Sequence, residues 1–321
     1  MTSPRTLIVS PQKTGTHLIQ ELMLELGYRI VGATRPSEHN IPQFTVEQRK
    51  QIAALVYRPE ECTEICEDTG SEDFIERTDA AWTALCWSWY RRFGQPVISR
   101  YGQERLDFAD AVSTNPRINS TRFDQTPEGL CWIWHDLDMS KVDGNFIGEW
   151  CDTGEPPVIL NYRDPRDALV SLINFVEGKT AKGFGNFYER KIFNAILPTK
   201  ATMPEKIDYA LRDPYFPGRS EFEKSLWLLN HPGVCKVRYE DLAGPQGGGD
   251  STLQVQAVER VLKHVGATQY DAEGIASRIY NTDSWSFHKG RIGKWREAFS
   301  EENTRLFQEI YGDILEQYGY E

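Results

Sequence analysis

The sequence predicts an α/β fold in which helices flank a mostly parallel sheet. Short apolar runs typical of buried strands open three units, at residues 5–10, 157–163 and 234–239. Each run is followed by a polar loop and then by an amphipathic helix, the alternation that produces a parallel sheet covered on both faces. A length of 321 residues suffices for the core of one large domain. We therefore expect residues 1–321 to form a single three-layer domain.

The first unit places a polar loop between a strand and a helix. Arg5–Ser10 is rich in β-branched residues and ends at Pro11, and the next helix is indicated by apolar residues at helical spacing: Leu18, Ile19, Leu22, Met23 and Leu26. The loop between them ends in Lys13, Thr14, Gly15, Thr16 and His17. A helix N-terminus behind a glycine turn presents free N–H groups to an anion. The loop therefore predicts a cradle for a phosphate or a sulfate.

The order of the residues in this loop excludes one class of phosphate site. The loop of nucleoside triphosphatases has the pattern G-x-x-x-x-G-K-[ST], in which the lysine follows the second glycine. In this chain Lys13 comes before Gly15, and the loop contains no other glycine. The loop is therefore P-loop-like in its position after the first strand, but it lacks the order that a triphosphate requires.

The second unit carries a cation at the end of its strand. Arg163 closes the strand, and Asp164 followed by Pro165 is a helix start, with aspartate as the N-cap and proline in the first helical position. The predicted buried residues of this helix are Leu169, Leu172, Ile173 and Val176. Ser171 faces away from them, on a polar face that Asp167 shares. An arginine and a hydroxyl in this position suit a second phosphate group.

The third unit and the C-terminal region complete the expected architecture. A glycine-rich loop at residues 244–249 precedes a helix whose inward residues are predicted to be Leu253, Ala257, Val258, Val261, Leu262 and Val265. Capping patterns predict further helix starts at Thr45, Ser220 and Ser300. Residues 287–296 concentrate basic side chains in an acidic chain, which indicates an anionic partner.

Composition excludes several classes of function. The chain has 36 Lys and Arg against 47 Asp and Glu, a net charge of −11, which argues against nucleic acid or an anionic membrane as its main partner. No apolar run approaches the length of about 20 residues that a membrane span requires. The six cysteines are sparse and no apolar signal segment opens the chain, so we expect a cytoplasmic protein. Cys62 and Cys66 have no second ligand pair nearby, so no metal site is predicted.

Taken together, these motifs resemble the cytosolic-type sulfotransferases, whose donor is 3′-phosphoadenosine 5′-phosphosulfate (PAPS) and whose product is adenosine 3′,5′-bisphosphate (PAP). The loop after the first strand looks like the family's phosphosulfate-binding loop, the start of the second helix like its 3′-phosphate motif, and the segment 287–296 like its C-terminal clamp. The residues that this resemblance assigns to the donor are Lys13, Thr14, Gly15, Thr16, His17, Arg163, Ser171, Tyr239, Lys289 and Gly290.

The resemblance also implies a mechanism. Sulfuryl transfer requires that charge on the leaving oxygen be neutralised, for which Lys13 is the candidate, and that the acceptor lose a proton to a base. His135 is the predicted base, because it precedes the second unit as the family's base histidine does, and His17 is the alternative. Two positions depart from the family pattern: Leu18 replaces a tryptophan that stacks on adenine, and His288 replaces an arginine at the 3′-phosphate. No metal is required.

The acceptor is predicted to be a small molecule with a hydroxyl or an amine. Residues 35–155 and 178–220 are rich in aromatic side chains, so we expect them to form the acceptor pocket and its lid and to favour an aromatic or lipid-like acceptor. Two other functions stay open at this point. One is a nucleotide-dependent kinase, which would require ATP and Mg²⁺, and the other is a PAP-binding protein without turnover. The oligomeric state is not predicted.

Overall fold

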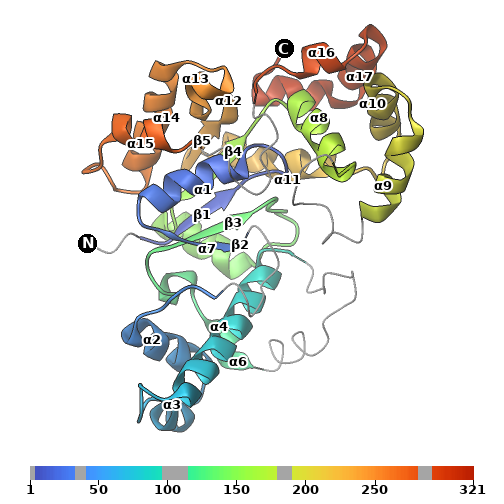
Figure 1. Ribbon diagram of the computed structural model, residues 1–321. Coiled ribbons are helices and arrows are strands. Elements are labelled where there is room, and N and C mark those ends of the chain that lie inside the picture. Colours follow the sequence, from blue (N-terminus) through green and yellow to red (C-terminus); the bar gives the residue numbers. More distant parts are fainter. Residues whose placement is uncertain (1–3, 33–40, 96–114, 179–189, 281–290) are drawn as a thin grey trace.

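Five parallel strands form the centre of the protein in the computed structural model (Figure 1). The structure describes residues 4–32, 41–95, 115–178, 190–280 and 291–321. The strands are β1 Thr6–Val9, β2 Arg29–Gly32, β3 Leu130–Trp134, β4 Val158–Tyr162 and β5 Val234–Arg238. They are hydrogen-bonded in the order β2-β3-β1-β4-β5, with each neighbouring pair parallel. The predicted single α/β domain is thereby confirmed.

Helices surround this sheet (Figure 1). In the N-terminal half they are α1 Thr16–Glu25, α2 Val46–Val56, α3 Pro59–Ile65, α4 Glu72–Arg92, α6 Pro116–Ser120, η2 Phe123–Gln125 and α7 Gly144–Thr153. In the C-terminal half they are α8 Pro165–Val176, α9 Lys191–Ile196, η5 Leu197–Thr199, α10 Met203–Arg212, α11 Arg219–Asn230, α12 Tyr239–Leu242, α13 Gly244–Gly247, α14 Ser251–His264, α15 Ala272–Arg278, α16 Trp295–Ala298 and α17 Glu301–Tyr318. Among the described helices, none is both long and apolar enough to cross a bilayer.

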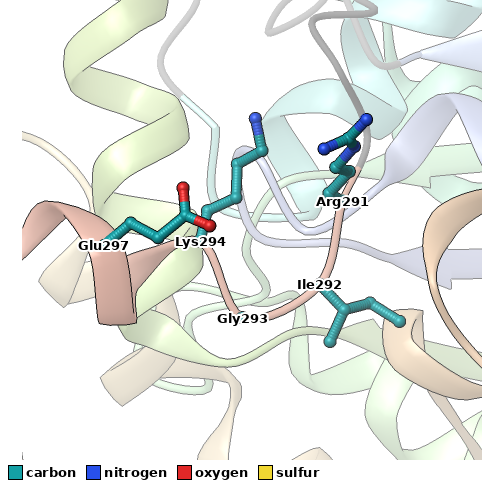
Figure 2. Close-up of a pocket in the computed structure, with 5 residues that line it drawn as sticks. All are labelled: Arg291, Ile292, Gly293, Lys294 and Glu297. Atoms are coloured by element: carbon teal, nitrogen blue, oxygen red, sulfur yellow. The ribbon is translucent and has the colours of Figure 1, made fainter.

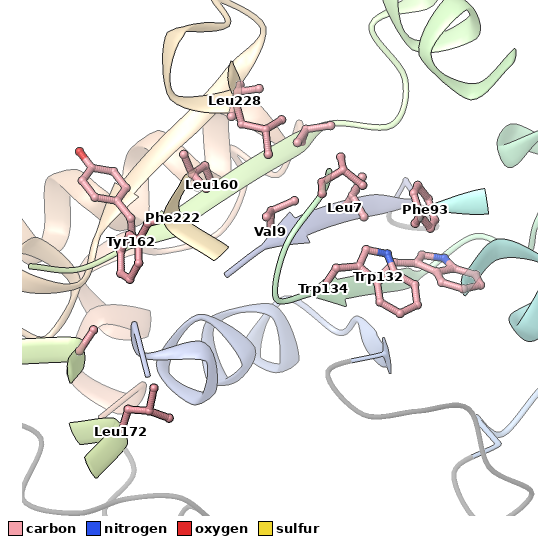
Figure 3. Packing of buried hydrophobic residues seen from close by; sticks show 14 of the residues in the cluster. Leu7, Val9, Phe93, Trp132, Trp134, Leu160, Tyr162, Leu172, Phe222 and Leu228 are labelled. Carbon is pink, nitrogen blue, oxygen red and sulfur yellow. The ribbon is translucent and has the colours of Figure 1, made fainter. Parts of the chain in front are cut away.

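Side chains alternate along the strands and so enter two separate cores. In β1, Leu7 and Val9 lie in one core and Ile8 lies in the other. The first core, part of which is shown in Figure 3, is rich in aromatic rings and is closed by helices that include α4, α11 and α17. The second core is mostly aliphatic and is closed by α1, α14 and α15. The central strands are therefore buried on both faces, as a doubly covered parallel sheet requires.

The sequence pattern does not predict β2 and β3. In β3 the Leu-Cys-Trp-Ile-Trp run looks like part of an aromatic-rich covering segment, but Trp132 pairs with Leu7 and Trp134 with Val9 in the sheet register. Both indole rings are buried in the first core. The four residues of β2 are half-buried, so this short strand lacks the apolar run that identifies its neighbours.

The aromatic residues of the segment 35–155 belong largely to the core. Trp82 packs against Trp132 with ring centroids 5.6 Å apart, and Trp89 packs against Phe123 at 4.9 Å. These rings are buried, so they are not available to line an open pocket. The predicted acceptor-pocket and lid roles of residues 35–155 and 178–220 stay predictions, and parts of both segments, 96–114 and 179–189, lie outside the described residues.

Most of the predicted helix starts are confirmed. Thr45 caps α2 with Gln48 in a capping box, and the side chains of Asp164 and Ser300 cap α8 and α17. Two expectations are wrong. The N-cap of α11 is Gly218, at φ 124°, so Ser220 lies inside the first turn. Leu253 is exposed because it lies in the first turn of α14, ahead of the apolar residues that enter the second core.

Candidate functional site

The strand order brings the predicted site residues to one edge of the sheet. Lys13 lies in the loop after β1, and the residues that directly follow β3, β4 and β5 are His135, Arg163 and Tyr239. In the strand order β2-β3-β1-β4-β5, β1 and β4 are neighbours at the centre of the sheet. The connection after β1 runs toward β2 and the connection after β4 runs toward β5, so the two connections diverge from this central pair. Open parallel sheets bind their ligands at such a point, beyond the carboxyl ends of the strands.

The loop after β1 has the backbone of an anion cradle. Gly15 adopts a left-handed conformation, with φ 93°, and α1 begins at the next residue, Thr16. A Cβ atom at Gly15 would lie 2.3 Å from Cδ2 of Tyr239, so glycine is required both by the turn and by the ring beneath it. The first N–H groups of α1, including that of His17, have no acceptor within the helix. This backbone suits a phosphate or a sulfate.

Buried hydrogen bonds support the cradle from below. Asn161 of β4 donates from Nδ2 to the Ser10 hydroxyl at 2.9 Å and to the Thr14 carbonyl at 3.1 Å. Thr14 is fully buried, and its hydroxyl donates to the Pro11 carbonyl at 2.6 Å. This hydroxyl therefore helps to fix the loop, and the predicted role of Thr14 toward an anion stays a prediction. The Thr16 hydroxyl is half-buried and shares a hydrogen bond of 2.9 Å with Ser10.

Lys13 stands in a strongly positive environment. Its Nζ lies 4.6 Å from the centroid of the Phe175 ring, and the guanidinium of Arg190 lies 5.6 Å from the same centroid. Burial, followed by the charges of Arg163 and Arg190, lowers the pKa of Lys13 to about 8. An opposite charge beside these groups would reverse that shift. The arrangement therefore favours a bound anion.

Arg163 links the loop to two other elements. Its guanidinium lies 4.4 Å from the centroid of the Tyr239 ring, and Nη1 donates to the Lys13 carbonyl at 3.5 Å. Nη2 donates to the carbonyl of Arg291 at 2.8 Å and lies 3.4 Å from the carboxylate of Asp167. Among the described residues, the buried Nε has no hydrogen-bond partner. Such a group retains the capacity to bind a negatively charged oxygen.

Asp167 holds the C-terminal segment against α8. Its carboxylate accepts hydrogen bonds from the backbone N–H groups of Gly293, at 2.7 Å, and Trp295, at 2.9 Å. The sequence pattern predicts that Asp167 lies on an exposed polar face of the helix, but the residue is buried. The reason is that these two N–H groups and Arg163 enclose its carboxylate. Ser171, one turn further along α8, is half-buried, and its hydroxyl has no hydrogen-bond partner among the described residues.

A polar cavity of about 350 Å³ lies at the same C-terminal segment (Figure 2), and its lining residues are Arg291, Ile292, Gly293, Lys294 and Glu297. Figure 2 shows the side chains of Arg291 and Lys294 extending to the same side of the segment. Because Arg291 also contacts Arg163, this cavity adjoins the end of β4. Lys289 and Gly290, which the sequence predicts as donor-binding residues, lie outside the described residues.

His135 has the hydrogen bonding of a base. Its Nδ1 lies 2.9 Å from the carbonyl oxygen of Ser10. A carbonyl only accepts, so Nδ1 carries the proton and Nε2 of the neutral ring has a free lone pair. Burial is the main cause that lowers the pKa of His135, and the charges of Arg190 and Lys13 add to it. Burial also lowers the pKa of His17, so both histidines are neutral at pH 7.

Sequence reasoning misses three residues beside this site. Glu221, from the first turn of α11, accepts hydrogen bonds from Gln12, and the guanidinium of Arg190 donates to the Gln12 side chain. Burial raises the pKa of Glu221 to about 7. Gln12 stands in the loop that the sequence singles out, but no local pattern connects it to residues about 180 and 210 positions away.

Comparison with known proteins finds likenesses that include two sulfotransferases. Sulfotransferase 6B1 of Danio rerio is 24% identical over 170 residues, which are 51% of this chain and 53% of that protein, so the chain matches about half the length of this relative. The crystal structure of mouse sulfotransferase SULT7A1 complexed with PAP matches 98% of this chain and 84% of that one, with a TM-score of 0.50 and 12% identity. No family model matches. The structural likeness confirms the predicted α/β fold class.

We expect Gly15→Ala to destabilise the protein by about 2–4 kcal/mol, because the substitution adds a strained φ angle and a clash with Tyr239. The measurement is the free energy of unfolding in urea. The matched control is Gly27→Ala, which has a similar φ of 79° but no atom within 4 Å of its added Cβ, and it should cost only about 1 kcal/mol.

In a Tyr239→Ala background, Gly15→Ala should cost about as much as Gly27→Ala, because the clash is gone and only the strain remains. Equal losses for the two glycine substitutions in the wild-type background would contradict the assigned contact between Gly15 and the Tyr239 ring.

Proposed function

We propose that this protein transfers a sulfuryl group from PAPS to a hydroxyl or an amine of a small-molecule acceptor. The observation that carries the proposal is the meeting of three buried or half-buried cations, Lys13, Arg163 and Arg190, beside the N-terminus of α1 in a chain of net charge −11. The sulfotransferase fold and the sulfotransferase relative support the same activity in general terms. The neighbouring structure is complexed with PAP, which supports PAPS as the donor.

The residues of the site fit the two charged ends of this donor. The cradle at Gly15, with the N–H groups of Thr16 and His17, suits the 5′-phosphosulfate. Arg163, whose Nε has no partner among the described residues, suits the 3′-phosphate. Ser171 lies on α8, the helix that follows Arg163, and is proposed to bind the same group. Arg291 and Lys294, which line the adjoining cavity, supply further positive charge near the end of β4.

Tyr239 is proposed to contact the adenine. Its ring packs against Gly15 and lies under the guanidinium of Arg163, so it joins the two ends of the proposed donor site. Leu18, which stands where related sequences carry a stacking tryptophan, is buried in the second core. The stacking surface for the adenine must therefore come from another residue.

Two residues are proposed to carry the chemistry. Lys13 neutralises the negative charge that develops on the leaving oxygen of the donor, a task that requires its ammonium form. His135 accepts the acceptor's proton at Nε2, while its Nδ1–H is held by the Ser10 carbonyl. Neither role requires a metal ion. His17 remains the alternative base, since it lies in the cradle itself.

The acceptor is proposed to be a small molecule with a hydroxyl or an amine. The aromatic side chains that predict an aromatic or lipid-like acceptor lie largely in the core. The polar groups around His135 are Arg190, Asp136 and Lys13. A hydroxyl or amine acceptor suits this environment.

We expect PAP without a metal to raise the unfolding temperature, because a ligand that binds only the native state stabilises it, by about 2.7 kcal/mol at about 100 times Kd. The comparison is ATP with Mg²⁺ at equal concentration. Stabilisation by ATP with Mg²⁺ alone would indicate a kinase. Stabilisation by PAP without any sulfuryl transfer to a panel of phenols, alcohols and amines would indicate a binding protein without turnover.

Lys13→Ala should lower kcat by about 10²–10³, the loss typical of removing one group that stabilises transition-state charge.

Because the pKa of Lys13 is lowered to about 8, its ammonium is lost as the pH rises through that value. The affinity for PAP should therefore fall above pH 8, by up to about tenfold per unit. Calorimetric titration of PAP from pH 7 to pH 10 measures this.

Lys13→Arg is the control for the pH dependence, because a guanidinium stays charged throughout this range. Its PAP affinity should be constant from pH 7 to pH 10. The same alkaline fall in both proteins would assign the titration to another group.

His135→Gln should lower kcat by about 10²–10⁴ and leave PAP affinity unchanged, because the variant loses a base but not a cation of the donor site. Transfer from radiolabelled PAPS measures the rate, and calorimetry measures the affinity. His17→Gln is the parallel variant. If only His17→Gln loses turnover, the base is His17.

A further inference from the structure

One buried carboxylate holds the Lys13 loop from a distant helix. Glu221 of α11 accepts a hydrogen bond from the backbone N–H of Gln12 at 2.5 Å and another from the Gln12 side-chain amide at 2.6 Å. The side-chain carbonyl of Gln12 accepts from the guanidinium of Arg190. The residue immediately before Lys13 is therefore fixed through its backbone and through both ends of its side chain.

This attachment matters because of the backbone of Lys13. Lys13 has a φ of 67°, the left-handed region, and is the single residue other than glycine with positive φ in the described part of the chain. Such a conformation is strained for a residue other than glycine and persists only where the surroundings impose it. On one side Thr14 is held by Asn161 and by the Pro11 carbonyl. On the other side, the backbone of Lys13 is held by Gln12, which Glu221 and Arg190 fix in place.

We propose that Glu221 is the positioning residue of the Lys13 loop: by fixing Gln12 it maintains the strained backbone from which Lys13 reaches the donor, without contacting the donor itself. The role assigned to Lys13 rests on the proposed function. The contact between Glu221 and Gln12 does not, since it is formed by residues of the chain alone.

The charge state of Glu221 is part of this role. Both carboxylate oxygens accept hydrogen bonds from Gln12, and protonation would turn one of these oxygens into a donor and a weaker acceptor. Burial raises the pKa of Glu221 to about 7, against the opposing effect of the Gln12 N–H bond. The charged and titratable groups that face it are Arg190, Asp136, Lys224 and, from α17, Tyr311. Protonation below about pH 7 should therefore loosen the hold on Gln12.

The test compares Glu221→Gln with Glu223→Gln. The first variant places an amide nitrogen opposite one of the two Gln12 donors, so one hydrogen bond is lost. The second is a matched control on the same helix, whose exposed carboxylate pairs with Arg219 at 2.7 Å. Amide hydrogen exchange of the peptide covering residues 10–18 measures the loop without any ligand.

In Glu221→Gln we expect faster exchange of this peptide and a kcat lower by about 10- to 100-fold, the cost of a misplaced reacting group, with a smaller change in the KM for PAPS. The fall in kcat that protonation of Glu221 causes near pH 7 should also be absent, which leaves the fall that protonation of His135 causes at lower pH. Glu223→Gln should match the wild type in each measurement. Gln12→Ala keeps Glu221 and removes only the hydrogen bonds of the Gln12 side chain. It should also raise amide exchange of the peptide and lower kcat. This variant replaces Glu221→Gln in the test if Glu221→Gln does not fold.

The outcomes separate this inference from the proposed function. If Glu221→Gln and Gln12→Ala exchange and turn over like Glu223→Gln, the positioning role is wrong while the sulfotransferase proposal stands. If exchange of the loop rises but the wild-type protein neither binds PAP nor transfers sulfuryl groups, the positioning of the loop stands and the proposed function fails.

Discussion

The site depends on three cations that the fold holds together at one edge of the sheet, where burial and their mutual repulsion both disfavour the charged lysine. Lys13 has a pKa lowered from 10.5 to about 8, chiefly by burial and then by Arg163 and Arg190. A shift of this size corresponds to a cost of about 3 kcal/mol for the charged lysine. An anion at the same place offsets that cost, because it is attracted to each of the three groups. The arrangement is thus unfavourable when empty and favourable when it holds a strongly negative ligand.

The rest of the fold maintains this arrangement. Parallel strands bring the residues that follow β1, β3, β4 and β5 to one edge, so no single segment has to carry the whole site. Tyr239 packs against both Gly15 and Arg163, which connects β5 and β4 to the loop. Asp167 attaches the C-terminal segment to the same place through two backbone N–H groups.

The sequence predicts those parts of the site that lie next to a strong local pattern. Lys13 and Arg163 follow clear strands, so their places could be predicted. Only the family resemblance indicates His135, since its strand β3 lies within an aromatic run that no strand pattern identifies. The internal hydrogen bonds of the Thr14 hydroxyl could not be predicted, because the direction of a side chain within a loop depends on distant partners such as Asn161. Glu221 could not be predicted, since its contact with Gln12 spans 209 positions and leaves no local signal.

The most direct test of the account is a crystal structure of the protein with PAP, because it locates the ligand relative to the three cations. The account predicts the 5′-phosphate within hydrogen-bond distance of the N–H groups of Gly15 to His17 and of the Lys13 ammonium, and the 3′-phosphate at Arg163. Electron density for PAP at any other place, with the loop of Lys13 unliganded, would contradict it.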